Sequence, residues 1–326
     1  MSYKVILQNK YDLTPLVQSI SLKDSLEQIA YQGNVELVAG ASMPSVTPGD
    51  EIRISGVPLG KTEMVPLLHP AVVWDCDSSS NNGAKRISLT LYDRTIYLDK
   101  SEDEYLFPKN QTASQRVWKY AADWKIKLAS VPDTGKKLGK AVYRSQTIHA
   151  MMTADLQETA KAGGDLYHPR MTPSGLELYK LGSNKTVYVL DQNEEVSQSR
   201  TLEGAVTQVK VIGVSESASD SAASKVLAIE SKDKDKFGTL QALVQDDKVK
   251  TASAAKTLAK AKLRGIQQTF TVAAPDINII RAGDAVMLNG MRLIVTTVNH
   301  QLGSPGSMTL ELAAYEDVRR RYYLDG

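Results

Sequence analysis

The sequence Gly49-Asp50-Glu51-Ile52-Arg53-Ile54-Ser55-Gly56 recurs near the other end of the chain as Gly283-Asp284-Ala285-Val286-Met287-Leu288-Asn289-Gly290. In each copy a glycine gives the backbone the freedom for a turn, and the aspartate that follows can accept hydrogen bonds from nearby backbone amides. Apolar residues then alternate with other residues, which is the period of a β-strand with one buried face. The pattern therefore predicts the same turn and strand twice, marked by six turn residues: Gly49, Asp50, Gly56, Gly283, Asp284 and Gly290.

The likeness between the two ends of the chain extends beyond this motif. Upstream, and without a gap, residues 35–38 face residues 269–272, and both segments favour strands. Downstream, a strand, a polar turn and a second strand follow in the same order, at 72–76, 78–83 and 87–91 in the first copy and at 293–298, 303–306 and 308–312 in the second. The last strand follows the motif sooner in the second copy, so the first copy carries about 13 extra residues, which we assign to the loop 57–71. Four elements in the same order indicate an internal duplication.

Short alternating strands separated by turn residues are typical of small antiparallel barrels and sandwiches. With 326 residues, the chain has room for two or three domains. We therefore expect a mixed, β-rich α+β fold in which two homologous small antiparallel β-barrel domains are separated by a small α+β domain. The expected boundaries are 1–104 for the first barrel, 105–198 for the α+β domain, and 199–326 for the second barrel, with a hairpin or loop and a helix inserted at about 214–265.

The segment between the two copies carries helix and hairpin signals. Thr112 or Ser114 is expected to cap one helix, and Ser145 is expected to cap a second one that ends at Gly163-Gly164. A hairpin that turns at residues 172–175 follows. We interpret the aromatic and methionine side chains of this segment as core.

The second copy is preceded by a further group of elements. Residues 207–213 are expected to form a strand that enters the second barrel. In the Ser/Ala-rich and Lys/Asp-rich stretch after it, residues 226–229 and 240–244 are expected to pair as a hairpin with mobile ends. Thr251 is expected to cap a last helix that runs from Ala252 to about Gly265.

Composition limits the classes of function open to this chain. The formal net charge of +2 is too close to neutral for a dedicated nucleic-acid binder, which normally concentrates basic residues. The first ten residues lack the apolar core of a signal peptide, and no stretch approaches the length of a membrane span. The single cysteine, Cys76, excludes an internal disulfide, and its place in an expected strand favours a small buried residue over a nucleophile. Synthesis in a reducing cytoplasm is the simplest inference.

The sequence offers no arrangement typical of a catalytic, cofactor or metal site. The glycine patterns of phosphate-binding and dinucleotide-binding loops and the nucleophile elbow are missing. The acidic pairs Asp103-Glu104 and Glu194-Glu195 lie in expected loops, where nothing marks them as general acids. We interpret the basic and aromatic tail at 319–323 as a solvated or subunit-docking terminus. The four histidines are not spaced with another His, Cys or carboxylate in a metal-ligand pattern: His69, His149, His168 and His300. We therefore predict no catalytic residue, no cofactor, no metal and no enzymatic activity.

The order of these elements resembles the hub proteins of contractile phage tail baseplates. The likeness is strongest to the hub proteins of PBSX-like prophages, which are akin to the late-control D family. It is carried by the strand at 207–213, by residues 237–241 with the Ala-rich helix from Ala252, and by the phrase Ile280-Arg281-Ala282-Gly283-Asp284-Ala285-Val286. The likeness covers nearly the whole chain, and its motifs are structural.

The resemblance implies a homotrimer in which two tube-like barrels per chain form a pseudo-sixfold ring. Such a ring adapts the sixfold tail tube to the threefold central spike. The implied partners are further copies of this chain, the tail tube protein and the central spike protein, with tape measure and baseplate wedge proteins as further candidates. Neither a membrane nor a specific nucleic-acid sequence is implied. The loop 57–71 is a candidate for contact with the spike, the sheath side or the wedge.

The implied place is the baseplate of a virion or tail-like particle that is assembled in the host bacterial cytoplasm. An infectious phage, a defective prophage and a contractile bacteriocin all stay open as the type of particle. A tail-associated cell-wall hydrolase or wall-binding module is the main alternative function, but no catalytic pair of carboxylates and no lysozyme-like domain is visible. An oligonucleotide-binding barrel would need stacking aromatic residues beside basic ones, whereas these strands are mostly aliphatic.

Overall fold

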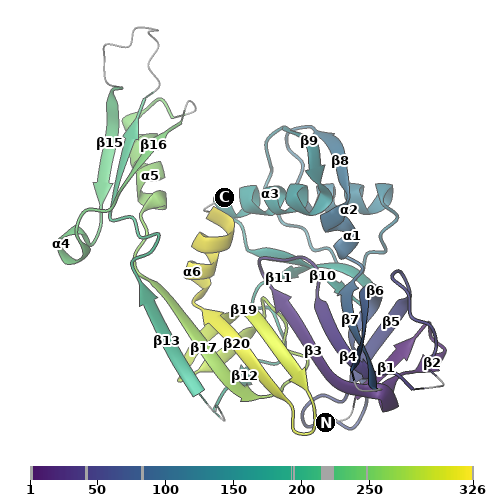
Figure 1. The fold of residues 1–326 in the computed structure, drawn as a ribbon. Helices are drawn as coiled ribbons and strands as arrows, with labels where there is room; N and C mark the ends of the chain where they lie inside the picture. Colours follow the sequence, from purple (N-terminus) through teal and green to yellow (C-terminus); the bar gives the residue numbers. More distant parts are fainter. Residues whose placement is uncertain are drawn as a thin grey trace. The chain divides into compact units, whose positions relative to one another are not determined.

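The structure is a computed structural model that describes residues 3–324 apart from 41–42, 82–83, 192, 194, 214–223 and 247–248 (Figure 1). The chain divides into two compact units, one formed by Met1–Ser197 with Phe270–Gly326 and the other by Gln198–Thr269. Part of the polar turn expected at 78–83, part of the Ser/Ala-rich stretch, and Glu194 lie outside the described residues.

The first unit is built mainly from strands, several of which form short hairpins. Its strands are β1 (Tyr3–Leu7), β2 (Tyr11–Asp12), β3 (Val17–Ser25), β4 (Gln32–Val38), β5 (Glu51–Gly56), β6 (Val65–Asn81), β7 (Ala84–Asp93), β8 (Glu102–Phe107), β9 (Ala141–Thr147), β10 (Tyr167–Thr172), β11 (Gly175–Lys180), β12 (Tyr188–Val189), β18 (Ala285–Leu288), β19 (Met291–Leu302) and β20 (Ser307–Ala313). Two more strands span the boundaries between the units: β13 (Glu195–Thr201) and β17 (Gln267–Pro275). The helical elements of the first unit are η1 (Thr14–Leu16), α1 (Ile96–Lys100), α2 (Ala113–Asp123), α3 (Ile148–Lys161), α6 (Tyr315–Val318) and the π-helical turn η2 (Arg319–Leu324).

One sheet runs through both copies of the duplicated motif. Its strand order is β13-β17-β20-β19-β3-β4-β7-β6-β5-β1-β2, and β18 pairs with the first four residues of β19. The two copies meet where β19 pairs with β3, from Thr297 opposite Ser25 to Leu302 opposite Ile20. Figure 1 shows these strands side by side, with the C-terminal one in yellow and the N-terminal one in purple.

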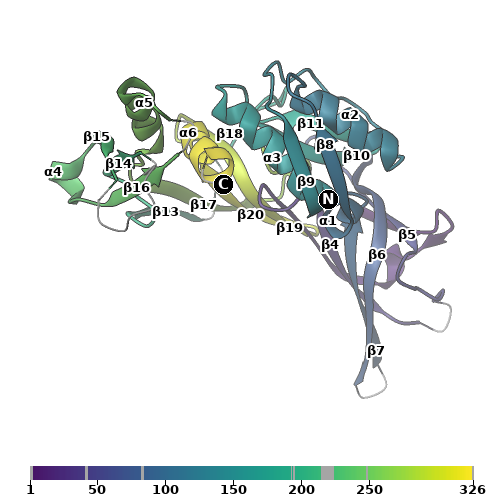
Figure 2. The same ribbon diagram turned by 90° about the horizontal axis from the view of Figure 1, so that it is seen from above.

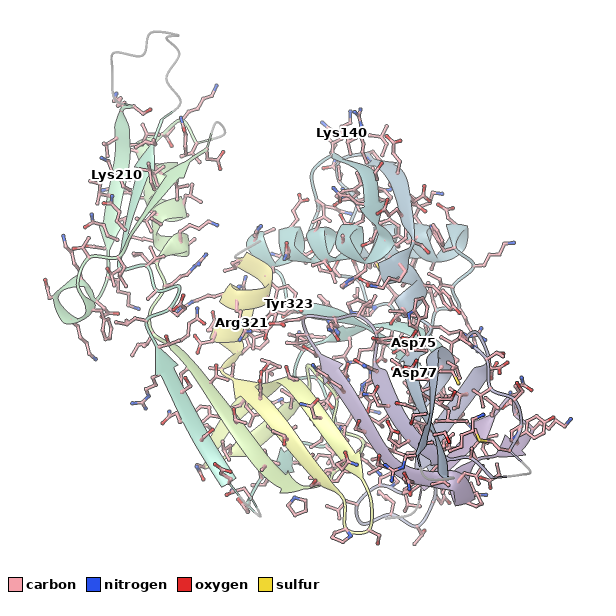
Figure 3. All side chains as sticks on the ribbon, in the orientation of Figure 1. Asp75, Asp77, Lys140, Lys210, Arg321 and Tyr323 are labelled. Atoms are coloured by element: carbon pink, nitrogen blue, oxygen red, sulfur yellow. The ribbon has the colours of Figure 1, made fainter. Side chains whose placement is uncertain are left out.

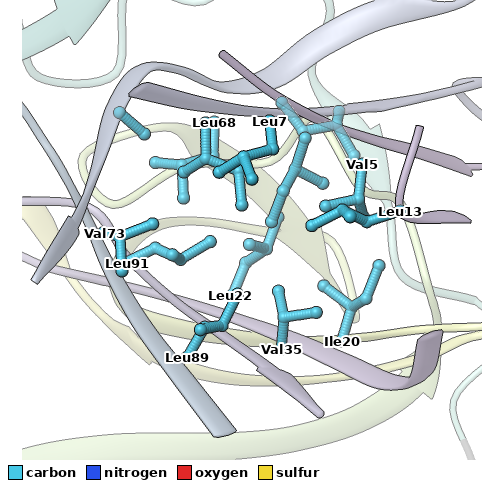
Figure 4. Packing of buried hydrophobic residues seen from close by; sticks show 14 of the residues in the cluster. Val5, Leu7, Leu13, Ile20, Leu22, Val35, Leu68, Val73, Leu89 and Leu91 are labelled. Atoms are coloured by element: carbon cyan, nitrogen blue, oxygen red, sulfur yellow. The ribbon is translucent and has the colours of Figure 1, made fainter. Parts of the chain in front are cut away.

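Alternation along the strands gives each copy its own core. In β5, Ile52 and Ile54 are fully buried, and in β20 the same is true of Leu310 and Leu312. Burying a side chain of this size stabilises the fold by about 1.5–3 kcal/mol. Figure 4 shows the first core, which includes Val5, Leu7, Leu13, Ile20, Leu22, Val35, Leu68, Val73, Leu89 and Leu91. The second core includes Phe270, Val272, Val286, Leu288, Val295, Val298 and Leu310.

The predicted fold class, a β-rich fold with antiparallel sheets and a few helices, is confirmed. Among the described residues, the strand pairings do not close either copy into a barrel. The division into three domains stays a prediction. The structure groups most of the predicted middle domain with both copies in the first unit, and the second unit, Gln198–Thr269, is wider than the insertion expected at about 214–265.

The middle segment contains the two predicted helices and the predicted hairpin. Thr112 caps α2 through a capping box with Gln115, so the first of the two expected candidates is the cap. The cap of α3 is Thr147, and the prediction of Ser145 is wrong because β9 continues to Thr147 in its pairing with β8. The hairpin β10–β11 turns with Thr172 opposite Gly175, as predicted.

The second unit contains a three-stranded sheet and a helix that packs on it. The strand β14 (Gln208–Ile212) lies between β15 (Val226–Ser231), which is antiparallel to it, and β16 (Gln241–Gln245), which is parallel. The short helix α4 (Lys234–Phe237) follows β15, and the longer α5 (Ala252–Lys262) covers the buried Val209 and Val211 of β14.

Two predictions for this segment are therefore wrong. The strand predicted at 207–213 does not enter the second copy, because β14 belongs to the sheet of the second unit. Residues 226–229 and 240–244 do not pair with each other, because β14 carries the most deeply buried residues and takes the central position between them. The predicted helix is present, and Thr251 caps it by accepting a hydrogen bond from the backbone N–H of Ala254.

The C-terminal tail packs on its own chain. The Tyr323 hydroxyl donates to the carbonyl of Tyr167 at 2.8 Å, and Arg319 donates to the carbonyl of Ala160 at the end of α3 at 2.7 Å. Arg321 pairs with Glu27 at 2.8 Å, and Figure 3 labels Arg321 and Tyr323. The tail is therefore not fully solvated, because its tyrosines contribute to a core with α3 and β10, and docking of another subunit on it stays a prediction.

Candidate assembly surface

The two Gly-Asp turns contain the same hydrogen bonds. In each turn the aspartate Oδ2 accepts from the backbone N–H three residues earlier, which is Thr47 for Asp50 and Arg281 for Asp284, at 2.9 Å in both cases. The aspartate N–H donates back to the carbonyl of that same residue at 3.1 Å in both. The carboxylate thus replaces a partner that the backbone of a tight turn would otherwise lack.

Backbone hydrogen bonds connect each turn to the second strand of its hairpin, β6 in the first copy and β19 in the second. The glycines have φ of +97° at Gly49 and +90° at Gly283, a region that other residues rarely adopt. Each glycine N–H donates to a valine carbonyl, Val73 at 2.8 Å and Val295 at 2.7 Å, and each valine N–H donates to the aspartate carbonyl at 2.9 Å. The motif is therefore a repeated structural joint as well as a repeated sequence.

Strand registers extend this equivalence along both hairpins. Glu51 lies opposite Val72, and its counterpart Ala285 lies opposite Ile294. A bulge follows at the same place, between Val73 and Asp75 in β6 and between Val295 and Thr297 in β19. Bulges re-aim a strand and are specific to a position, so their coincidence supports a common origin for the two copies.

The registers also locate the extra residues of the first copy. Positions 52–71 lie between the paired Glu51 and Val72, whereas only positions 286–293 lie between the paired Ala285 and Ile294, so 12 of the about 13 extra residues fall within the hairpin β5–β6. The second hairpin turns tightly through Asn289 and Gly290, whose φ values of +50° and +77° suit a two-residue turn. In the first copy the longer connection leaves Leu59 52% exposed and is held at Val57, whose carbonyl accepts from Asn278 at 3.1 Å.

The upstream match at 35–38 and 269–272 is displaced by three residues. Val35 lies opposite Leu89, and the residue in the equivalent place of the second copy is Val272, which lies opposite Leu310. The ungapped prediction is wrong because the loops before the two Gly-Asp turns differ in length. A shift by an odd number of residues exchanges the two faces of a strand. The ungapped alignment therefore matched the buried Val35 to the partly exposed Thr269.

The six turn residues occupy two different environments. Asp50 is near the surface and also accepts from the side chain of Gln8 at 2.7 Å, whereas Asp284 is mostly buried and accepts from Arg170 at 2.9 Å. Gly56 is the last residue of β5, where a Cβ would lie 2.7 Å from a methyl group of Leu67. Gly290 instead lies in the tight turn after β18. One turn geometry has thus been kept while its surroundings have diverged.

A buried ion pair links the first copy to the second. Arg281, which precedes the second turn, donates through Nε to the carboxylate of Asp24 in β3, and its guanidinium lies 3.9 Å from the ring centre of Tyr31. Asp24 also accepts from the backbone N–H of Ala282 at 3.1 Å. Burial opposes ionisation of Asp24, but the positive charge of Arg281 outweighs it and holds the pKa of the carboxyl below its usual range.

The middle segment contributes a second cation to this region. Arg170 in β10 pairs with Asp284 at 2.9 Å, and its guanidinium lies 3.2 Å from the ring centre of Tyr179. His168 is buried nearby, and burial lowers its pKa to about 3, so the imidazole is neutral at physiological pH. Sequence reasoning missed this cluster. The one signal in the sequence was a difference between the copies: Arg281 occupies the position that Thr47 has in the first copy.

Two strand edges are each the equivalent, in the other copy, of an edge that takes part in the pairing of β19 with β3. In the described part of the chain, neither of these two edges has a strand beside it. Residues 297–302 of β19 pair with β20 on one side and with β3 on the other. The equivalent part of β6, from Asp75 onward, pairs with β7 alone among the described residues. Figure 2 shows this part of the hairpin β6–β7 projecting from the sheet, and Figure 3 labels the exposed Asp75 and Asp77 on it.

The other of the two edges belongs to β13, the first strand in the order of the sheet. In the second copy β13 lies next to β17, and in the first copy the equivalent neighbours are β3 and β4. All seven residues of β13 are exposed. Unpaired strand edges promote association with further strands, and native proteins normally pair, cover or charge them. The residues that the structure describes cover neither of these two edges.

The histidines and the cysteine are partly or fully buried beside, or bonded to, other groups of the chain. No group of three or more His, Cys, Asp or Glu side chains that could hold a metal ion is found among the described residues. His300 is fixed by Asp276 at 2.6 Å and by the carbonyl of Ile280 at 2.9 Å, and His149 lies 3.3 Å from Asp99. Burial raises the pKa of the Cys76 thiol, which keeps it protonated.

The acidic pairs and the helices add no further site. Glu104 lies 3.6 Å from Arg144 on the surface, and Glu195 is exposed on β13. Within the described ranges, the helices are too short or too polar to cross a lipid bilayer.

Comparison with known proteins shows the family of this chain. The family model described as YQBQ-like matches residues 20–313, which is most of the chain. The chain belongs to the YqbQ-like family. The uncharacterized protein YqbQ of Bacillus subtilis strain 168 is 25% identical over 205 residues, which span 59% of this chain and 60% of YqbQ.

Solved structures with the same fold include phage tail proteins. A 43 kDa tail protein of prophage MuSo2 from Shewanella oneidensis has a TM-score of 0.73 at 11% identity, over 97% of this chain and 99% of its own. A tail protein from Neisseria meningitidis MC58 has a TM-score of 0.69 at 15% identity, over 99% and 100%. A type VI secretion component of Escherichia coli, described as similar to the T4 tail proteins gp27 and gp5, has a TM-score of 0.55 at 10% identity, over 97% and 77%. At these identities the likeness establishes the fold.

Proposed function

We propose that this chain is the structural hub of a contractile tail baseplate, a homotrimeric ring that adapts the sixfold tail tube to the threefold central spike without catalysing a reaction. The observation that carries the proposal is the joint between β19 and β3, which connects the two copies edge to edge within one chain. Among the described residues, the equivalent edge of the first copy, on β6, and the equivalent of β3 in the second copy, β13, are both left open.

Ring closure follows if β6 of one chain pairs with β13 of the next chain as β19 pairs with β3. Such a contact is heterologous, and a heterologous contact forms a closed ring when its rotation divides a full turn. Each chain supplies two similar modules, so three chains present six similar surfaces around the axis. The internal joint and the joint between chains would then alternate around the ring.

The proposal assigns parts of the chain to different partners. Modules at 1–104 and 199–326, flanking an α+β domain at 105–198, would form the ring, and the turns at Gly49-Asp50 and Gly283-Asp284 would repeat around it. The tail tube would bind one face of the ring and the spike the other, with tape measure and wedge proteins as further partners. The exposed Leu59 on the longer hairpin β5–β6 supports the region 57–71 as a contact present in only one module.

The names of the structurally similar tail proteins support a place in the tail of a virion or tail-like particle. We propose that this place is the baseplate and that the particle is assembled in the bacterial cytoplasm. The same names support a structural rather than a catalytic role. The described residues contain no group of three or more His, Cys, Asp or Glu side chains that could hold a metal ion, so no observation supports a metal-dependent cell-wall hydrolase as the alternative.

The test of this proposal is the mass of the purified chain, alone and with its tube and spike partners, by native mass spectrometry. We expect a trimer, formed by the chain itself or on addition of the spike. Proline at Ser197 and, separately, proline at Gln198 provide matched variants, because successive N–H groups of a strand point to opposite edges. Only the proline that removes the outward N–H should block the trimer while the chain stays folded. A monomer in complex with both partners would refute the proposal.

A further inference from the structure

A cavity of about 560 Å³ lies in the first unit, where α1 and the end of α2 meet β6 and the turn of the hairpin β10–β11. This volume is in the range of sites that receive ligands or large side chains. Its inner wall is mainly apolar and includes Tyr97, Leu98, Trp124 and Met171. No residue of the duplicated turns lines it, and Pro70 is the one lining residue that belongs to the region 57–71.

The apolar wall includes aromatic side chains that are still partly open to water. Tyr97 is 45% exposed, and Trp124 is only partly buried. Covering aromatic surface of this kind is favourable, at about 25 cal/mol per Å² of apolar area. Trp and Tyr are also enriched among the residues that dominate binding energy at protein interfaces.

The wall is held in shape by backbone hydrogen bonds. After α2 the chain turns back, and the N–H of Ile126 donates to the carbonyl of Ala121 at 2.8 Å. The N–H of Leu176 in β11 then donates to the carbonyl of Lys127 at 2.8 Å, and its carbonyl accepts from the N–H of Ala129 at 2.8 Å. The segment is thereby fixed against the hairpin, and a preformed wall reduces the ordering cost of binding.

The mouth of the cavity is positively charged. Lys125 and Lys127 are both exposed there, and neither has an ion-pair partner among the described residues. The carboxylates nearby are already engaged, since Asp123 pairs with Lys119 and Glu51 pairs with Arg94 at 3.3 Å. In the described part of the chain, no acidic residue lines the cavity.

We propose that this cavity receives an apolar side chain of another tail protein, in a segment that also carries a carboxylate opposite Lys125 and Lys127. An apolar floor with flexible cations at its mouth suits a side-chain anchor beside an acidic residue. A small-molecule site would instead place several convergent polar groups within the wall. The proposal relies on the proposed function only for the class of the partner, a tail protein other than this chain.

Lysine acetylation of the free chain and of particles assembled from the co-expressed tail genes tests whether the cavity is covered. We expect Lys125 and Lys127 to be labelled in the free chain and protected about tenfold or more in particles, as for charged groups buried in an interface. Lys109 and Lys140 are exposed lysines of the same segment and serve as matched controls that should stay labelled. Equal labelling of the first two lysines in both states would overturn the proposal. Protection that is already present in the free chain would point to a small molecule and would overturn it as well.

Zero-length carbodiimide cross-linking of the same particles identifies the occupant. The expected product joins Lys125 or Lys127 to an Asp or Glu of a different tail protein, in a segment with a neighbouring apolar residue. A cross-link to a carboxylate of a second copy of this chain would overturn the choice of partner.

A charge-reversal variant provides the functional arm. Lys125→Glu/Lys127→Glu should weaken binding of the cross-linked segment, made as a synthetic peptide, by about 10-fold to 100-fold, since two charged contacts become repulsive. Lys109→Glu/Lys140→Glu should leave it unchanged, and unchanged binding in the first variant as well would count against the proposal. The mass of the ring is measured on each variant, so a failure of the trimer is distinguished from a failure of this site.

Discussion

Replacing Arg281 by methionine should destabilise the first unit far more than the loss of a surface cation. The substitution keeps much of the aliphatic packing but leaves Asp24, whose side chain is 2% exposed, without its counter-charge. Removing one partner of a buried ion pair costs about 3–5 kcal/mol, and loss of the cation above the Tyr31 ring adds about 1 kcal/mol. We expect a decrease of about 4–6 kcal/mol in the free energy of unfolding, which is a large fraction of the stability of an ordinary domain.

Urea unfolding followed by tryptophan fluorescence reports on the first unit, which contains Arg281, because all three tryptophans belong to that unit: Trp74, Trp118 and Trp124. Arg94→Ala is the matched control, since the ion pair of Arg94 with Glu51 is exposed and should contribute less than about 1 kcal/mol. The double variant Asp24→Asn/Arg281→Met should recover most of the loss, because no unpaired charge stays buried.

The pH dependence gives an independent check of the cause. In the native protein the pKa of Asp24 is lowered, so its contribution to stability is present above the unfolded pKa of 3.8 and is lost as pH falls through the folded pKa. Without Arg281, burial is the largest influence that remains, and we expect it to raise the pKa of the Asp24 carboxyl. The destabilisation by Arg281→Met should therefore be smaller near pH 4 than at pH 7. If Arg281→Met cost no more than Arg94→Ala, or the double variant lost as much as the single one, the reasoning would be refuted.

Three other predictions concern single groups of the first unit. Burial raises the pKa of Asp93 to about 6, so its contribution to stability is full below pH 3.8 and is lost as pH rises through 6. Urea unfolding of the native protein should therefore give a free energy about 2.4 kcal/mol lower at pH 7 than at pH 4 from this group, and Asp93→Asn should remove that decrease, whereas an equal decrease in both proteins would contradict this. Gly290→Ala places a side chain at φ +77° in the turn of β18–β19 and should lower the midpoint of thermal unfolding through a loss of about 1–2 kcal/mol, whereas an unchanged midpoint would argue against a strained turn. Tyr323→Phe removes the hydrogen bond to the Tyr167 carbonyl and should cost about 0.5–1.5 kcal/mol in urea unfolding, with Tyr97→Phe, an exposed tyrosine, as the neutral control.

The parts of the fold that sequence reasoning predicted correctly are those set by local chemistry. The Gly-Asp turns, the alternating strands after them and the caps at Thr112 and Thr251 each depend on residues a few positions apart. The repeat also helped, because two copies of a weak local signal support each other. The position of the extra residues between β5 and β6 followed from the same comparison.

The parts that failed depend on partners far away in the sequence. The strand β14 alternates as well as a strand of either copy, and alternation identifies its buried face without naming the strands beside it. The displacement upstream of the turns arose because a loop of different length leaves no mark in the strands that it connects. The joint between β19 and β3 connects strands from opposite ends of the chain, and only the folded sheet reveals it.

The candidate assembly surface was predicted in its logic but not in its residues. The duplication predicted two similar modules but not the strands at their edges, because β13, with the sequence Glu-Val-Ser-Gln-Ser-Arg-Thr, has no apolar alternation that would mark it as a strand. The arginine at 281 was part of the quoted family phrase, but its partner in β3 lies in the other copy.

The unequal lengths of the hairpins β5–β6 and β18–β19 affect how many binding sites of one kind a ring presents. In a ring of three chains, a molecule that recognises features common to both copies meets them six times around the axis, while one that recognises the longer connection between β5 and β6 meets it three times. Binding stoichiometry would thus be set by loop length alone, with the sheets unchanged. Shortening the longer loop to the length of its counterpart would remove the threefold docking pattern and leave only the sixfold one.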